Sequence, residues 1–431
     1  MRGTCLFVLT LFAGGTVVHA DPGELDRRLQ AGEVPNALRK KVQPCVDRAV
    51  AFLVARQAKD GSFEEHGPQE TPAARTTVTL WAALALRHAG TRPALAACDR
   101  AAAWLFDGGA ARRAELESRT ADLGLALMLL LGLPERRALV QPLATRLVEA
   151  IDPVTGFWTT RTAAAKDERG SLAASQLAID GLVAARAAGA TVPTSVWRSH
   201  ARGLLASRDA RSRAWPLVLG AAAATDGTLF AIGSLGALAG LPTAPEGADG
   251  ISEVDMSRVL RDAHTAIGRD AGRALENPLA RFSVIDEEDA LVMPQGKPPF
   301  GVIGKEDGTE RQLFVGEGAY VRLFAVVRMS LFAGLPTVDA YPKGKHIAGP
   351  GERKPTPVPC YASAAGWLLE RQRRDGGFAS EANDPKAQRS ETDTALALLT
   401  LTRALSAYDP VTPAPMDAIP RPAPPPAAGP K

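Results

Sequence analysis

The stretch QAKDGSF at residues 57–63 joins two helical patterns and decides the fold of this chain. Before it, residues 46–57 carry apolar side chains on one side and charges on the other, which is typical of a helix lying on a core. Asp60 and Gly61 end that helix, because glycine readily adopts the left-handed conformation of a helix C-terminus. The following run TVTLWAALAL, residues 77–86, is apolar or small all round and predicts a buried helix. The unit is an exposed helix, a glycine turn and a buried helix.

The same unit returns near the other end of the chain. Residues 45–86 align with residues 360–401 without a gap, and the second turn reads QRRDGGF at 372–378. Self-similarity at a fixed spacing is typical of a repeat architecture. Because each copy is one helical hairpin, the hairpin is the repeating unit of the fold.

Weaker copies of the hairpin fill the chain between these two. Asp60, Asp107 and Asp152 mark successive turns, 45 to 47 residues apart. For each of hairpins two to five we expect one outer helix followed by one inner helix. The expected pairs are 95–106 with 120–131, 136–151 with 171–188, 194–207 with 226–240, and 253–275 with 318–332. In hairpin five, β-prone runs flank Asp307 and Gly308, which predicts a two-stranded flap over 297–316.

Six hairpins predict an all-α fold, an α6/α6 toroid with a small β-hairpin insertion in hairpin five. The buried helices would stand parallel as an inner ring, with the exposed helices around them. An open superhelix is the alternative. The close match of the first and last hairpins favours closure, because the terminal repeats of an open solenoid tend to differ from the interior ones.

The first twenty residues are typical of a secretion signal. Arg2 precedes an apolar run at 6–12. Val18 and Ala20 are small residues at the two positions that signal peptidase recognises before a cleavage site. The run is too short to span a bilayer, and a buried first helix is the alternative. We therefore expect an exported protein, periplasmic or extracellular, without a membrane span. The expected layout is a signal peptide at 1–20, an N-terminal segment at 21–42, the toroid at 43–408 with an insertion at 278–316, and a disordered tail at 409–431 with nine prolines in the last 22 residues.

Export would place Cys45, Cys98 and Cys360 in an oxidising compartment. Cys45 and Cys360 are equivalent positions of two hairpins that ring closure would make neighbours. Equivalent positions on adjacent helices lie roughly 8–10 Å apart, however, and a disulfide needs a closer approach. We therefore expect three buried thiols in preference to a bond that closes the ring.

Composition excludes several kinds of partner. With 46% hydrophobic and 23% charged residues and a net charge of +3, the chain is ordinary globular material without a basic surface for nucleic acid. No predicted inner helix begins with Cys or His, so we expect no metal site and no cofactor. The acidic run at 286–289 lies in the insertion and is interpreted as a solvated charge run.

The two turn motifs, at 57–63 and 372–378, resemble the QxxxGxW repeat of squalene and oxidosqualene cyclases and the related repeat of protein prenyltransferase β subunits. Phenylalanine stands in the Trp position. At the level of the hairpin pattern the resemblance covers most of residues 45–408, and it implies the α/α toroid of the terpenoid cyclase and prenyltransferase superfamily. In that superfamily the repeat residues are structural.

The residues that carry out catalysis in those relatives are not all present in this chain. Cyclases of the squalene–hopene kind carry DxDDTA at the head of an inner helix, and its middle aspartate protonates the substrate. Here the stretch is SETDTA at 390–395, so Asp393 matches but Thr392 stands in the place of the proton donor. Aromatic side chains, which shelter carbocations, make up only 5% of the chain. Both observations argue against cyclisation by that route.

The family precedent places function where the inner helices begin. Asp393 and Glu391 are the candidate catalytic residues. The candidate ligand-binding residues are Arg75, Arg119, Asp122, Asp226, Glu317 and Tyr320. Such a set can bind a polar ligand, or transfer protons where burial raises a carboxyl pKa. The interpretation we favour is that the acids cap free N–H groups at the helix starts.

Two hypotheses about function remain from the sequence. The first is a secreted, non-catalytic toroid that binds a small molecule, a lipid or a carbohydrate at its centre, or a protein partner. The second is an enzyme using the carboxylates at the helix heads, either a divergent isoprenoid cyclase or a polysaccharide lyase or hydrolase. A filled centre with engaged acids favours the first, and an open pocket with a desolvated carboxylate facing a polar group favours the second.

Overall fold

A computed structural model describes residues 36–64, 72–163, 168–209, 214–221, 225–239, 319–332, 337–340, 356–379 and 389–402. The predicted signal peptide, the polar helix at 253–275, the insertion with its flap, Glu317 and the proline-rich tail lie outside the described residues. The described part is mostly helical, which confirms the all-α class.

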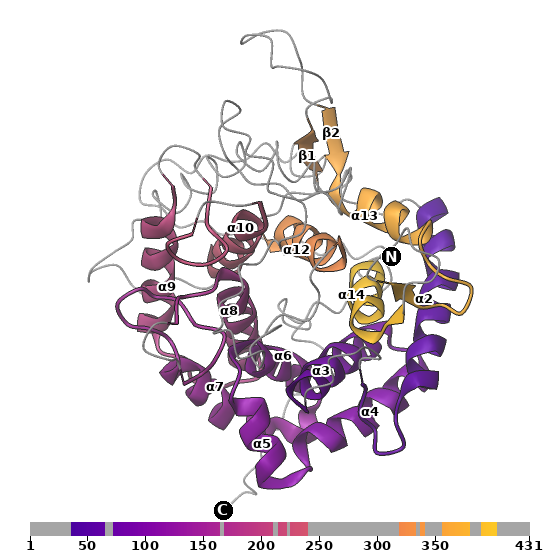
Figure 1. The fold of residues 1–431 in the computed structure, drawn as a ribbon, viewed down its shortest axis with the longest axis horizontal. Helices are drawn as coiled ribbons and strands as arrows, with labels where there is room; N and C mark the ends of the chain where they lie inside the picture. Colours follow the sequence, from indigo (N-terminus) through magenta and orange to yellow (C-terminus); the bar gives the residue numbers. More distant parts are fainter. Residues whose placement is uncertain are drawn as a thin grey trace, which may run out of the picture.

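In the described part, six helices form an inner ring (Figure 1). They are α3 (Pro72–Ala89), α6 (Thr120–Leu131), α8 (Leu172–Ala187), α10 (Thr225–Ala239), α12 (Ala319–Phe332) and α14 (Glu391–Thr402). Each packs against the next in this order, and α14 packs against α3, so the ring is closed. As the all-round apolar pattern predicts, every side chain of α14 and all but the last residues of α6 and α8 are buried.

Among the described residues, the outer layer contains α2 (Asn36–Arg56), α4 (Arg92–Phe106), α7 (Val140–Glu149), α9 (Thr194–Ser207) and α13 (Cys360–Leu369). These helices bury one side only. On α4 the buried residues are Ala94, Ala97, Cys98, Ala101, Ala102 and Leu105, which recur at helical spacing. The closed double layer of hairpins confirms the predicted α/α toroid.

Three helix predictions differ from the structure. The first outer helix begins at Asn36, ten residues before the predicted start and inside the segment predicted to precede the toroid. A helix absent from the prediction, α5 (Gly109–Glu117), follows the second turn. It buries only Leu116, so it carries almost no apolar pattern. The third outer helix is divided into a 3-10 helix, η1 (Pro134–Leu139), and α7, because Pro134 starts a short separate turn.

The first turn holds hairpin one against hairpin two. The side-chain amide of Gln57 donates to the carbonyl oxygens of Gly61 and Ala97, each at 2.8 Å. Arg100 on α4 donates to the Gln57 amide oxygen at 3.0 Å through Nε. Gly61 has a φ of 95°, and a Cβ there would strike the Arg100 carbonyl, so only glycine fits.

The ring closes through the same joint between hairpins six and one. The side-chain amide of Gln372 donates to Gly376 O at 3.0 Å and to Cys45 O at 2.7 Å. Arg48 on α2 donates to the Gln372 amide oxygen at 2.9 Å through Nε. Gly376 has a φ of 93° and lies against the Arg48 carbonyl. Closure therefore repeats the contact already used between neighbouring hairpins.

The aromatic position of the motif ties each turn to an inner helix. Its backbone N–H donates to a hydroxyl in four hairpins: Phe63 to Thr79, Trp158 to Ser175, Trp215 to Thr228 and Phe378 to Thr394, at 2.9 to 3.1 Å. The two tryptophans also donate from the indole nitrogen to Leu147 O and Leu204 O, each at 2.7 Å. The motif residues are thus structural, as the resemblance implies.

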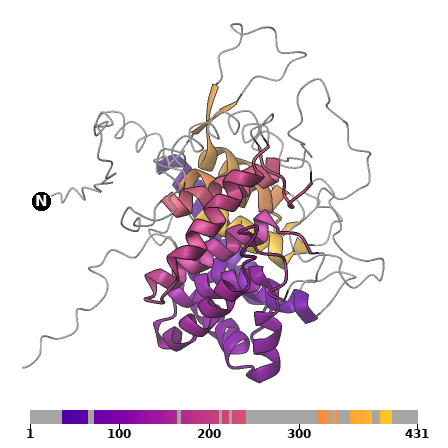
Figure 2. The same ribbon diagram turned by 90° about the vertical axis from the view of Figure 1, so that its left-hand side faces the viewer.

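The described strands form two small antiparallel pairs. The ribbon of β1 (Thr337–Ala340) and β2 (Thr356–Pro359) leads into α13 and projects from the helical ring in both views (Figures 1 and 2). The pair β3 (Phe378–Ala379) and β4 (Arg389–Ser390) lies directly before α14. Neither pair is the flap predicted for 297–316.

Cys45, Cys98 and Cys360 are buried thiols outside any disulfide, which confirms the expectation over a ring-closing bond. Burial raises the pKa of the Cys45 thiol to about 11 and that of Cys98 to about 12. Both thiols therefore stay protonated and unreactive at neutral pH. None of the helices in the described ranges has the combination of length and apolar character that crossing a membrane requires.

Candidate functional site

The N-termini of successive inner helices meet on one face of the ring. The Thr120 N–H at the start of α6 donates to Thr160 O at 3.1 Å, in the loop that leads to α8. The Leu172 N–H at the start of α8 donates to Leu217 O at 2.9 Å, in the loop that leads to α10. The helix heads proposed from the sequence therefore do come together at one face.

Asp122 forms a polar cluster between the heads of α3 and α6. It is 1% exposed, and its Oδ1 accepts a 2.8 Å hydrogen bond from the Thr77 hydroxyl. Arg119 donates to the same hydroxyl at 3.0 Å. Within the described ranges, Asp122 Oδ2 is buried and has no hydrogen-bond partner. Asp122 thus links two inner helices and does not cap its own, contrary to the interpretation favoured from the sequence.

Burial raises the pKa of Asp122 to about 6. The positive charge of Arg119 and the hydrogen bond from Thr77 oppose this rise, and the negative charge of Glu115 adds to it. Burial dominates because a charged carboxylate loses its hydration there. The carboxyl therefore exchanges its proton close to neutral pH.

At the head of α14, Glu391 is fully buried and Asp393 is 5% exposed. The guanidinium of Arg56, at the end of α2, lies 3.8 Å from a Glu391 carboxylate oxygen. The backbone N–H of Asp393 donates to the Ser390 hydroxyl at 2.9 Å, so Ser390 supplies the side-chain cap. Both candidate catalytic residues are therefore buried in the first turn of α14, with Glu391 facing an arginine.

Arg75 lies on the outside of the first turn. Its guanidinium is 2.8 Å from Asp60 Oδ2 and 2.9 Å from Glu64, and it donates to the Ser62 hydroxyl. It also lies over the Trp104 ring, 5.3 Å from the centroid. These contacts hold the turn in place, so the Arg75 side chain packs against the turn and the Trp104 ring.

Tyr320 packs as a core residue between α12 and α13. It makes edge contacts with Trp367 and Phe378, each with ring centroids 5.7 Å apart. Asp226 lies in the first turn of α10, but its side chain is outside the described part of the structure. All of Glu317 is also outside it. Of the predicted ligand-binding set, the structure brings Arg119 and Asp122 into one cluster and gives Arg75 and Tyr320 packing contacts.

A line of buried side chains joins three inner helices that are not neighbours in the ring. Trp81 on α3 meets Phe324 on α12 edge-on at 5.4 Å, and the Arg328 guanidinium lies 5.4 Å from the Phe324 centroid. Arg328 Nη2 is 2.7 Å from Asp180 Oδ2 on α8. These four residues, which we name the cross-ring bridge, are at most 8% exposed.

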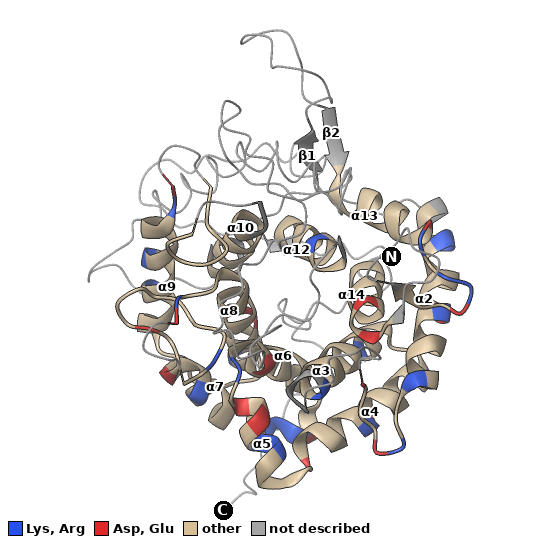
Figure 3. Ribbon diagram, viewed as in Figure 1, with Lys and Arg blue, Asp and Glu red and all other residues tan. Residues whose placement is uncertain are grey.

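The cross-ring bridge joins helices that are not neighbours in the ring. Helix α14 lies between α3 and α12, and α10 lies between α12 and α8 (Figure 1). A straight path between second neighbours passes on the inner side of the helix between them. Figure 3 accordingly shows basic residues on α12 and acidic residues on other inner helices. The sequence analysis missed Asp180 and Arg328; the available signal was a charged residue in the interior of a helix whose neighbouring residues are apolar or small.

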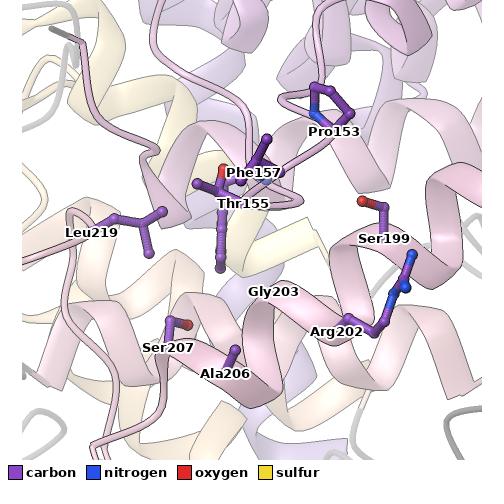
Figure 4. A pocket seen from close by; sticks show the side chains of 10 residues that line it. Pro153, Thr155, Phe157, Ser199, Arg202, Gly203, Ala206, Ser207 and Leu219 are labelled. Atoms are coloured by element: carbon purple, nitrogen blue, oxygen red, sulfur yellow. Dashed lines mark hydrogen bonds between the residues drawn. The ribbon is translucent and has the colours of Figure 1, made fainter.

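A pocket of about 400 Å³ lies on the perimeter of the molecule (Figure 4). Phe157 and Leu219 supply apolar surface, and Arg202 on α9 supplies a cation. None of its lining residues belongs to an inner helix. It is therefore separate from the inner-helix heads.

His200 stabilises the third turn. It is fully buried, its Nδ1–H donates to Gly156 O at 2.8 Å, and burial lowers its pKa to about 4. Its ring contacts Phe157 and Trp158 edge-on. Over the described ranges, no three His, Cys, Asp or Glu side chains gather as metal ligands do.

No family model and no curated protein matches this sequence. Among solved structures, the chain is similar to the α-1,6-mannanase GH76A of Salegentibacter sp. HEL1_6, with a TM-score of 0.50 and 10% identity over 84% of this chain and 99% of that one. An inactive variant of that mannanase, with two consecutive aspartates replaced by asparagine, binds α-1,6-mannotriose and matches with a TM-score of 0.50 and 11% identity.

A variant of the type II terpene cyclase MstE of Scytonema with one aspartate replaced by alanine, in complex with its product merosterolic acid A, matches with a TM-score of 0.48 and 14% identity over 86% of this chain and 99% of that one. At such identities a structural match concerns the fold alone. The mannanase match agrees with the α/α toroid seen in the helix packing.

Proposed function

We propose that this protein is an exported α/α toroid that binds a ligand at the N-terminal face of its inner ring, without the cyclase or transferase chemistry of the family it resembles. The cross-ring bridge is the observation that carries the proposal. Cyclisation requires a deep chamber with aromatic faces around a carbocation. Here Arg328 on α12 and Asp180 on α8 place a buried ion pair inside the ring, beside α10.

The acids at the head of α14 support the same proposal. Glu391 already faces Arg56, and Thr392 occupies the place of the proton donor. A carboxylate that serves as the counterion of an arginine is not available to protonate a substrate. The signal-like sequence at 1–20 supports export.

Native mass spectrometry of the protein purified from its own host tests this function. We expect a mature chain that begins at Asp21 and retains one small molecule, which is released chemically unchanged on denaturation. A chain that retains nothing would contradict binding. A chain that retains residues 1–20 would contradict export.

An enzyme is the second candidate, because Asp122 meets one requirement for acid–base catalysis. Its pKa of about 6 suits a group that donates and accepts protons near neutral pH. The fold likeness to a mannanase supports a polysaccharide hydrolase or lyase within this class, beside a divergent isoprenoid cyclase. This chain has no two consecutive aspartates, however, and two such aspartates are replaced in the inactive variant of that enzyme.

Turnover assays separate the two candidates. The wild type, Asp122→Asn and Asp393→Asn are incubated with soluble polysaccharides and with squalene, followed by mass spectrometry of the products. The binding function predicts no product from any of the three proteins. Product from the wild type that disappears in Asp122→Asn would establish catalysis and overturn the binding proposal.

A further inference from the structure

The contact between hairpins three and four departs from the joints at turns one and six. In those two turns the glycine lies against the backbone carbonyl of an arginine on the next outer helix, Arg100 or Arg48. Gly156 in the third turn lies in the same way against the Ser199 carbonyl on α9. Ser199 therefore stands in the position of the two arginines, and its side chain is too short to fill their space.

The pocket of about 400 Å³ lies at this third turn (Figure 4), and we name it the perimeter pocket. At the other two joints the arginine donates to the side-chain oxygen of a glutamine, Gln57 or Gln372. Residues 151–158 contain no glutamine, and Ser199 lines the pocket. The pocket thus occurs where the Arg–Gln pair of the repeated joint is absent, and its volume is within the range of small-molecule sites.

The perimeter pocket has apolar walls. Phe157 is buried and Leu219 is half-buried, and both present hydrocarbon surface to the pocket. Val154, which also lines it, is 92% exposed and is the only large hydrophobic side chain so exposed among the described residues. A ligand that covers these side chains removes their apolar surface from water, which favours binding.

Arg202 adds a positive charge to the same pocket. It follows Ser199 by three residues on α9, and Figure 4 shows the two at one end of the pocket, with Leu219 at the other. Helix α9 contains no acidic residue, and among the described residues no carboxylate forms an ion pair with Arg202. Asp152, the carboxylate of the third turn, instead accepts hydrogen bonds from within its own turn. The exposed guanidinium is therefore available to an anion from outside.

We propose that the perimeter pocket binds a small carboxylic acid with an apolar chain, a fatty acid of medium length. The planar guanidinium of Arg202 matches a carboxylate with two parallel hydrogen bonds, and the hydrocarbon chain lies against Phe157 and Leu219. A neutral sugar would leave the charge unused, and an inorganic anion would leave the apolar walls in water. The pocket lies away from the inner-helix heads, so this binding is additional to the proposed function.

Two variants test the two parts of the site. Ser199→Arg places in the pocket the arginine that the other joints carry, and Arg202→Gln removes the cation at an exposed position. Arg198→Gln is the matched control, because Arg198 lies on the same helix and does not line the pocket. Calorimetric titration of the full chain uses octanoate, with octanol as its uncharged analogue and acetate as a carboxylate without an apolar chain.

We expect octanoate to bind the wild type and Arg198→Gln equally, Arg202→Gln about fivefold more weakly, and Ser199→Arg not at all. Octanol should bind the wild type more weakly than octanoate does, and acetate should not bind. Octanoate binding that neither Ser199→Arg nor Arg202→Gln weakens, or no binding by the wild type, would overturn the proposal. Equal binding of octanoate and octanol would overturn the role of Arg202. If Ser199→Arg does not fold, Arg202→Gln decides the outcome, because a surface substitution leaves the fold intact.

Discussion

At the scale of single residues, Asp122 and His200 couple the stability of the fold to pH in opposite directions. The folded pKa of Asp122, about 6, lies above its ordinary value of 3.8, so the folded state binds this proton more tightly than the unfolded state. The free-energy cost of burying the charged Asp122 carboxylate is absent below the ordinary pKa and reaches its full size above pH 6. The folded pKa of His200, about 4, lies below its ordinary 6.5, so its penalty grows as pH falls between those values.

Replacing Asp122 by Asn removes the Asp122 contribution and leaves that of His200. Relative to wild type, the variant should gain stability as pH rises from 4 to 7, by about 3 kcal/mol in the free energy of unfolding, since each pKa unit corresponds to about 1.4 kcal/mol. Urea unfolding at pH 4, 5, 6 and 7 measures this. The control is Asp99→Asn, at an exposed position on α4, which removes a surface carboxylate and leaves the buried Asp122 in place. A difference between Asp122→Asn and wild type that does not change with pH would show that Asp122 is not desolvated.

At the scale of helices, the closest packing in the ring is between α6 and α8. Gly181 lies against the backbone of Gly124, and Gly124 lies against the backbone of Leu177. A Cβ at either glycine would meet backbone atoms, which cannot rotate away. The two glycines therefore set how closely these inner helices approach.

Gly181→Ala should lower the free energy of unfolding by about 1–3 kcal/mol, because an added methyl group must push α6 and α8 apart. Gly366→Ala on α13 is the matched control, since no atom lies within 4 Å of the Cβ it would carry. There alanine should be neutral or stabilise by up to about 1 kcal/mol, through its higher helix propensity. Thermal and urea unfolding measure both variants. Equal effects of the two substitutions would show that the α6–α8 contact is not close.

The sequence predicted the ring well where its pattern was strong and poorly where a contact crosses the ring. The predicted ranges 120–131 and 194–207 agree with α6 and α9, because all-round and one-sided apolar patterns depend only on local residues. The polar helix α5 has no such pattern. At the site, Arg119 and Asp122 were found because they are near one helix start. Asp180 and Arg328 were missed because they lie in the middle of helices separated by a third.

At the scale of the whole molecule, closure makes the two ends of the chain neighbours. Arg48 and Gln372 are 324 positions apart in sequence and hydrogen-bonded in space. The equivalent pair, Arg100 and Gln57, joins hairpins one and two with the same atoms. Because the two joints are alike, the Arg100–Gln57 joint serves as the reference for the Arg48–Gln372 joint. In an open superhelix the Arg100 joint would persist and the Arg48 joint would not exist.

A double-mutant cycle therefore tests closure directly. Arg48→Ala, Gln372→Ala and the double variant should show a coupling energy of about 1 kcal/mol, as expected for an exposed hydrogen bond with a charged donor. The cycle of Arg100→Ala and Gln57→Ala should give a coupling of the same size. Both are measured by urea unfolding of the four proteins in each cycle. Zero coupling between Arg48 and Gln372, with coupling retained between Arg100 and Gln57, would mean an open solenoid. It would also remove the closed ring inside which the cross-ring bridge lies.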